Sequence, residues 1–101
     1  MKTILIVEDD MILNKTLAYN LTSDGYEVTS AYKYHDTVNY LKDKEFDVAL
    51  LDINLPDGNG LDLCQEIRGR GQHTYMIFLT ANDRESDMLK GYEAGGADYI
   101  T

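Results

Sequence analysis

The chain has 101 residues, of which 44% are hydrophobic and 27% are charged, and its formal net charge is −9. These values are typical of one small soluble globular domain, and the lack of clustered Lys and Arg excludes nucleic-acid binding by this chain alone. The one cysteine, Cys64, has no partner for a disulfide. We therefore expect a small packed residue in a reducing, cytoplasmic compartment.

The first part of the chain predicts a strand, a helix and a second strand. Thr3–Val7 is an apolar β-type run that ends at three acids, and it is too short for a signal-peptide core or a membrane span. A helix is predicted over residues 10–23, with Asp10 as its N-cap, because leucines recur at every fourth position. An Asp-Gly pair ends this helix, and Glu27–Ala31 is a short strand candidate.

The middle of the chain repeats this alternation around a loop. Residues 36–44 are a weaker helix candidate, and residues 46–51 form a strongly buried strand that ends at Asp52. Residues 54–60 contain a proline and two pairs of the Asp-Gly or Asn-Gly type, so they predict a loop whose turn residues carry no chemistry. A helix is predicted over residues 61–68, where a glycine ends it.

The last part of the chain contains a third buried strand, Tyr75–Leu79, which ends at Thr80. A helix over residues 83–94 follows, and residues 97–101 begin another strand. Strands that are apolar throughout are buried on both faces. The repeated β-α units therefore predict an α/β fold, a doubly wound parallel sheet with helices on each side.

Three of the buried runs end in polar side chains: Glu8, Asp9 and Asp10 after the first, Asp52 after the second, and Thr80 after the third. In a parallel sheet these groups gather at one edge, where ligands bind. Neighbouring carboxylates stay ionised together only with a cation or with raised pKa values, and an all-oxygen cluster suits Mg²⁺. One carboxylate could then act as a nucleophile toward a phosphoryl group.

Four segments in this order, residues 6–10, 51–60, 79–81 and 93–101, resemble the receiver domain of the two-component response regulators. The resemblance implies a flavodoxin-like (CheY-like) sheet with strand order 2-1-3-4-5, and it makes residues 1–101 one phospho-accepting receiver domain. The loop and the final segment are similar to those of the OmpR/PhoB transcription-factor subgroup.

The resemblance also implies which residues carry the chemistry. Asp52 would accept a phosphoryl group from a phosphohistidine of a sensor histidine kinase, or from a small acyl phosphate. Glu8, Asp9 and Asp52 would bind Mg²⁺ together with the backbone carbonyl of Asn54. The domain would assist its own phosphorylation and dephosphorylation, but it would be a signalling switch rather than a turnover enzyme.

Two further residues would pass the signal on. Thr80 would turn toward phosphorylated Asp52 and hydrogen-bond it, and Tyr99 would then swing inward. The surface change would control an output, transcription, through an effector domain outside this chain that could bind DNA. The family also places a homodimer contact at residues 83–94 and 97–101, and no membrane contact is expected.

The resemblance further implies a domain that is incomplete at its C-terminus. In the family, a lysine and a fifth helix follow the segment that corresponds to residues 97–101. We expect residues 1–101 alone to be destabilised or to self-associate by exchange of elements. We also expect signalling after phosphorylation to be weakened without the lysine.

Other functions remain open. A degenerate receiver would serve as a phosphorylation-independent dimerisation or docking module. A Mg²⁺-dependent phosphohydrolase would need a second acid where Asn54 stands. A flavodoxin-like cofactor binder would need a Gly/Ser/Thr-rich loop after the first strand, where Glu8 and its acidic neighbours would repel a phosphate. His35 and His73 are expected at the surface.

Overall fold

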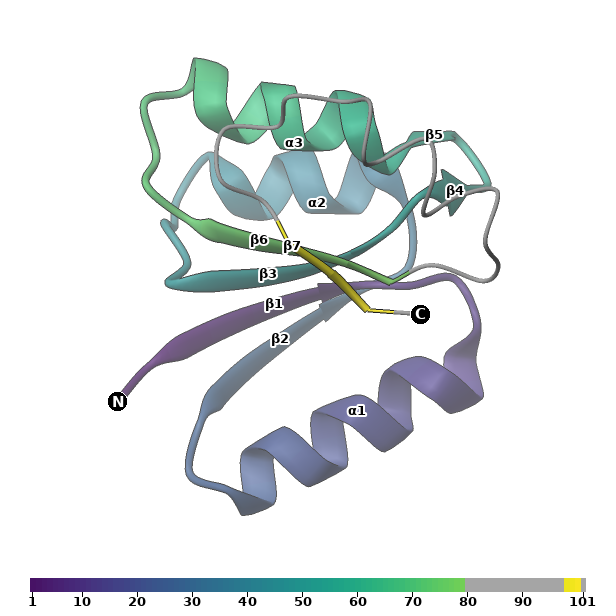
Figure 1. Cartoon of the computed structure of the whole chain (residues 1–101), viewed down its shortest axis with the longest axis vertical. Coiled ribbons are helices and arrows are strands. Elements are labelled where there is room, and N and C mark those ends of the chain that lie inside the picture. Colours follow the sequence, from purple (N-terminus) through teal and green to yellow (C-terminus); the bar gives the residue numbers. More distant parts are fainter. Residues whose placement is uncertain (80–97, 101) are drawn as a thin grey trace.

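A five-stranded parallel sheet forms the centre of the computed structural model, which describes residues 1–79 and 98–100 (Figure 1). The strand order is β2-β1-β3-β6-β7, and every described pair in this sheet is parallel. This order confirms the predicted 2-1-3-4-5 arrangement. The strands are β1 (Thr3–Val7), β2 (Glu27–Ala31), β3 (Val48–Asp52), β6 (Tyr75–Leu79) and β7 (Asp98–Ile100).

Helices lie on both faces of the sheet, as the doubly wound fold requires. Helix α1 (Met11–Ser23) covers one face, and helices α2 (Tyr34–Leu41) and α3 (Gly60–Gly69) cover the other (Figure 1). The helix predicted over residues 83–94 lies outside the described residues. Within residues 1–79 and 98–100, no helix has the length and apolarity needed to cross a bilayer.

Helix α1 begins at its predicted N-cap. The Asp10 carboxylate accepts hydrogen bonds from the backbone N–H groups of Ile12 (3.0 Å) and Leu13 (3.1 Å), which have no partner within the helix. Leu17 and Leu21 pack against the sheet, but Leu13 is 42% exposed. The predicted leucine stripe therefore faces the sheet only from the second turn of the helix onward.

Several element boundaries differ from the prediction. Helix α2 begins two residues before the expected range of 36–44 and ends three residues earlier. Phe46 is buried, but the strand ladder of β3 starts only at Val48. The predicted loop contains a small antiparallel ribbon, in which β4 (Asn54–Leu55) pairs with β5 (Gly58–Asn59). A search for long apolar runs does not detect such short strands.

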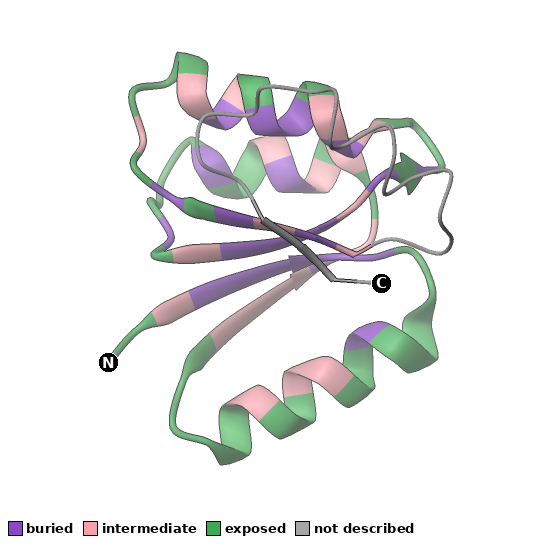
Figure 2. Cartoon of the chain, in the orientation of Figure 1, coloured by how far each residue is buried: buried purple, intermediate pink, exposed green. Residues whose placement is uncertain are grey.

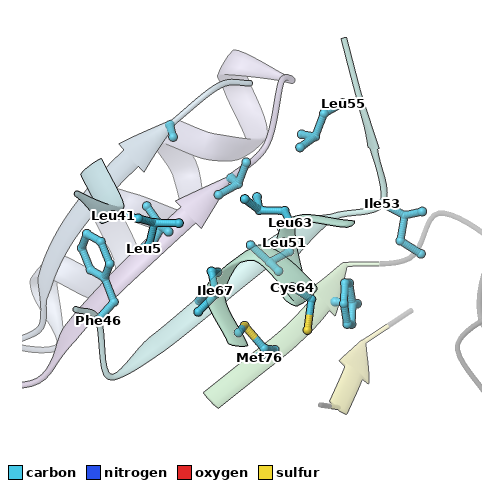
Figure 3. Packing of buried hydrophobic residues seen from close by; sticks show 14 residues of the cluster. Leu5, Leu41, Phe46, Leu51, Ile53, Leu55, Leu63, Cys64, Ile67 and Met76 are labelled. Atoms are coloured by element: carbon cyan, nitrogen blue, oxygen red, sulfur yellow. The ribbon is translucent and has the colours of Figure 1, made fainter. Parts of the chain in front are cut away.

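The core has two parts, one on each face of the sheet, because side chains alternate along each strand. Leu5 and Val7 of β1 face α2 and α3, whereas Ile4 and Ile6 face α1. Figure 2 shows that burial is concentrated in the strands and on the inner sides of the helices. Figure 3 shows the larger cluster, whose labelled members are Leu5, Leu41, Phe46, Leu51, Ile53, Leu55, Leu63, Cys64, Ile67 and Met76.

Candidate functional site

Three carboxylates meet at the carboxyl edge of the sheet. Glu8 and Asp9 follow β1, and Asp52 is the last residue of β3. The two strands are direct neighbours, with Val7 opposite Leu51, so the residues that follow them are brought together. One carboxylate oxygen from each of Glu8, Asp9 and Asp52 lies within 4.8 Å of the other two. The structure thus brings together three of the predicted site residues.

The cluster opens toward solvent on one side. Glu8 is only 6% exposed, Asp52 is half-buried, and Asp9 is exposed. The Glu8 carboxylate accepts the backbone N–H of Asp10 at 3.0 Å, which fixes its direction in the turn after β1. Asp10 itself turns away and caps α1, as predicted. A group that arrives from solvent can therefore reach Asp9 and Asp52, whereas Glu8 is shielded by its burial.

Burial and mutual repulsion perturb the protonation of the cluster. Burial, followed by the negative charge of Glu8, raises the pKa of Asp52 to about 7. Burial also raises the pKa of Glu8, although the hydrogen bond from the Asp10 N–H opposes this shift. The cluster therefore resists full ionisation near neutral pH unless a cation balances the charge. Hard oxygen donors that are partly open to water fit Mg²⁺, which keeps several water ligands.

The loop after β3 closes back onto Asp52. The backbone N–H of Asn54 donates to Asp52 Oδ1 at 3.4 Å, and the N–H of Gly60 donates to the carbonyl of Ile53 at 2.7 Å. A Cβ atom at position 60 would overlap the carbonyl oxygen of Asp52, so only glycine fits this close approach. From the sequence Gly60 is predicted only as a turn residue, and this contact is not predicted. The predicted role of the Asn54 carbonyl as a metal ligand remains a prediction.

Asn14 is a second residue that the sequence analysis missed. It lies in α1 and is fully buried, and its side-chain nitrogen donates to the carbonyls of Glu8 and Ala31, both at 3.0 Å. The bond to Glu8 ties the turn that carries two of the carboxylates to the first turns of α1. The sequence could have indicated its burial, though not its partners, because position 14 lies three positions before Leu17, which packs against the sheet.

Of the two predicted signalling residues, only Tyr99 lies within the described residues. Thr80 lies outside the described residues, although it directly follows Leu79, which pairs with Asp52 across β6 and β3. Tyr99 lies in β7, with its backbone opposite Phe78 of β6. The remaining minor expectations are confirmed: His35 and His73 are exposed, and Cys64 is buried.

A comparison of the sequence with known protein families gives a match that is consistent with the fold and with the carboxylate cluster. The sequence matches the response regulator receiver domain over residues 4–101. Because the match spans nearly the whole chain, this protein belongs to the family of response regulator receiver domains. The family that the sequence motifs resemble is thereby confirmed.

Solved structures of receiver domains superpose closely on the chain. The non-phosphorylated HemR receiver domain from Leptospira biflexa has 38% identity and a TM-score of 0.87, with 99% of this chain and 81% of that chain covered. TrrA from Thermotoga maritima, in complex with Mg²⁺-BeF, has 29% identity and a TM-score of 0.86, with coverage of 100% and 86%. DrrB, an OmpR/PhoB homologue from Thermotoga maritima, has 34% identity and a TM-score of 0.85, with coverage of 100% and 45%.

Proposed function

We propose that this chain is a phosphorylation-controlled receiver in which Asp52 accepts a phosphoryl group while Mg²⁺ is bound by the acidic cluster. The observation that carries the proposal is the position of Asp52, within 4.8 Å of Glu8 and Asp9 and half open to solvent. A carboxylate that served only as a surface charge would not be held half-buried against two others, because the repulsion has to be offset. TrrA, whose structure holds Mg²⁺-BeF, supports the choice of metal by analogy.

The proposed step is an in-line transfer to a carboxylate oxygen. An ionised Asp52 oxygen attacks phosphorus, the bond from phosphorus to the donor's imidazole nitrogen breaks, and the electron pair stays on that nitrogen. Mg²⁺ would supply the positive charge that balances the phosphoryl oxygens and the carboxylates. Glu8 and Asp9 would hold the cation together with Asp52, and Thr80 would hydrogen-bond the transferred group.

The proposed partners follow from this chemistry. The donor is a phosphohistidine of a sensor histidine kinase, which places the domain in the cytoplasm. The output is a population shift of the surface near β7, passed to an effector domain that regulates transcription. A homodimer contact through residues 83–94 and β7 would fit, because β7 is an edge strand of the described sheet. The domain assists its own phosphorylation and does not turn over a separate substrate.

Mass spectrometry of the intact protein tests the central step. The protein is incubated with acetyl phosphate and Mg²⁺, and we expect one added phosphoryl group on the wild type and none on Asp52→Asn. Asp62→Asn, an exposed aspartate of α3 outside the cluster, is the matched control and should be labelled like the wild type. An unlabelled wild type, or equal label on Asp52→Asn, would overturn the proposal in favour of a docking module without phosphoryl chemistry.

A further inference from the structure

The turn between β4 and β5 is attached to the start of a helix that lies far away in sequence. The Asp57 carboxylate accepts the backbone N–H of Tyr34 at 2.7 Å through Oδ1 and that of His35 at 3.0 Å through Oδ2. Each carboxylate oxygen thus binds one N–H group of the first turn of α2. These bonds hold the pKa of Asp57 below its usual range.

Helix α2 has no cap of its own. Its N-cap residue, Lys33, makes no side-chain hydrogen bond to the first turn. The first N–H groups of a helix have no partner within the helix, and a negative charge near them is favourable. Asp57 therefore acts as the N-cap of α2 from a different segment of the chain, 23 residues from Tyr34.

A second contact fixes the ribbon against the same turn of α2. A Cβ atom at position 58 would come within 2.7 Å of the Tyr34 ring, so Gly58 lets the ring lie directly against the turn. Tyr34 in turn packs on the larger core cluster, to which Leu55 of β4 belongs. The ribbon is thus held on α2 by two hydrogen bonds from backbone N–H groups to the Asp57 carboxylate and by packing of the Tyr34 ring.

The other end of the ribbon lies beside the phospho-acceptor. Asn54 is paired with Asn59 across the ribbon, and its N–H donates to Asp52 Oδ1. The Asn59 side chain accepts the N–H of Leu61 at 2.7 Å and so caps α3. The β4–β5 ribbon, through its strand pairing and these hydrogen bonds, therefore connects the α2 cap at Asp57 to the backbone next to Asp52.

We propose that Asp57 is a positioning residue for the acidic site, because its bonds to α2 hold the ribbon that sets Asn54 against Asp52. This inference rests on the proposed function for its link to Mg²⁺ and phosphorylation. Asp57 is not a member of the carboxylate cluster and would act through the ribbon. Coupling between sites is reciprocal, so occupancy at Asp52 should also protect the α2 amides that Asp57 binds.

The test compares two exposed aspartates whose carboxylates each accept a backbone N–H from another segment of the chain. Asp57 lies at the carboxyl ends of the strands, and Asp47 lies at their amino ends. Asp57→Ala removes the α2 cap. Asp47→Ala is the matched control, because the Asp47 carboxylate accepts the Thr3 N–H at 2.8 Å and the Thr3 hydroxyl at 3.2 Å, next to the amino end of β1. Asp57→Asn is the rescue variant, since its amide oxygen can still accept an N–H.

Two readouts are compared in full-length protein: amide hydrogen exchange, measured without metal and, for the wild type, also with Mg²⁺, and Mg²⁺ affinity by titration. We expect Asp57→Ala to speed exchange over residues 54–60 as well as at Tyr34 and His35, and to weaken Mg²⁺ binding by about 10-fold. Asp47→Ala should leave the exchange of these amides and the Mg²⁺ affinity unchanged. Asp57→Asn should give exchange rates and a Mg²⁺ affinity between those of Asp57→Ala and the wild type. In the wild type, Mg²⁺ should slow exchange at Tyr34 and His35.

Two results would overturn the inference. Faster exchange confined to α2, with residues 54–60 and Mg²⁺ affinity as in the wild type, would make Asp57 a helix cap and nothing more. An equal loss of Mg²⁺ affinity in Asp47→Ala would trace the effect to general destabilisation. If the wild type neither bound Mg²⁺ nor accepted label, the proposed function would fail, while the exchange over residues 54–60 would still decide whether Asp57 positions the ribbon.

Discussion

At the scale of single residues, ionisation of Asp52 opposes folding of the metal-free domain. Its pKa rises from 3.8 to about 7 in the folded chain, mainly through burial. Between these values the folded state holds a proton that the unfolded chain has lost, so the free energy of unfolding falls as pH rises through this window. Above about pH 7 the folded state carries the full free-energy cost of the ionised Asp52 carboxylate.

Asp52→Asn should therefore stabilise the metal-free protein at pH 8 and leave it nearly unchanged below pH 4. We expect a gain of about 1 kcal/mol at pH 8, because solvent screens the charge of this half-exposed carboxyl. Urea unfolding in the presence of a chelator, repeated from pH 4 to pH 8, measures the difference. A difference between variant and wild type that did not change with pH would contradict this assignment.

A second prediction at this scale concerns Asn14. Asn14→Ala removes the side-chain donor to the buried carbonyls of Glu8 and Ala31, although the Ala31 carbonyl still accepts the Glu8 N–H, so we expect a loss of about 2 kcal/mol in the free energy of unfolding. Asn20→Ala is the control, because Asn20 is an exposed residue of the same helix. Chemical denaturation of both variants gives the comparison, and the same small change in the two would mean that Asn14 contributes only its helix propensity, in which alanine exceeds asparagine.

The sequence predicts some site residues and misses others for a physical reason. Glu8, Asp9 and Asp52 are predictable because each follows a buried apolar run, and parallel strands bring such positions to one edge. Asn14 and Asp57 make hydrogen bonds to segments 17 and 22–23 residues away. No local pattern encodes such a partner, so their roles appear only when the segments are folded together.

At the scale of elements, tertiary contacts move the boundaries that periodicity predicts. Helix α2 starts at Tyr34 rather than at residue 36, because Asp57 satisfies the N–H groups of Tyr34 and His35. The long apolar runs are predicted well, because β1 and β6 have the expected bounds, and so does the short, partly exposed β2. Burial of the apolar residues determines β1 and β6, whereas the position of a helix end depends on the group that caps it.

Helix α3 offers an internal comparison between its first and last residues, both glycines. Gly60→Ala places a methyl group on the carbonyl of Asp52 and should destabilise the fold by about 2 kcal/mol and slow labelling of Asp52. Gly69→Ala meets no atom within 4 Å and should stabilise the helix by up to about 1 kcal/mol. Urea unfolding and the labelling rate are measured for both, and stabilisation by Gly60→Ala would show that α3 can shift freely against β3.

At the scale of the whole molecule, the fold class follows from alternating strands and helices, but the strand order does not. The order β2-β1-β3-β6-β7 places the first and third strands of the chain side by side. Apolar runs fix which segments are buried, yet any of them could be central on that ground alone. The order was predictable only through the family resemblance, and it is this order that brings Glu8 and Asp9 next to Asp52.

The same arrangement predicts how Mg²⁺ acts on the stability of the whole domain. A ligand that binds only the folded state stabilises it by mass action, by about 2.7 kcal/mol at a concentration 100 times its Kd. The effect should grow as pH rises through about 7, because the proton on Asp52 competes with the cation. Thermal unfolding at pH 6 and pH 8, with and without Mg²⁺, measures it.

Salt needs its own control in that experiment, because a formal net charge of −9 makes the fold sensitive to any screening ion. NaCl at the same ionic strength should raise the melting temperature less than Mg²⁺ does, and by a similar amount at both pH values. If NaCl reproduced the full shift, the stabilisation would come from the net charge of the domain and not from the carboxylates around Asp52. A specific site requires that the excess over NaCl be larger at pH 8 than at pH 6.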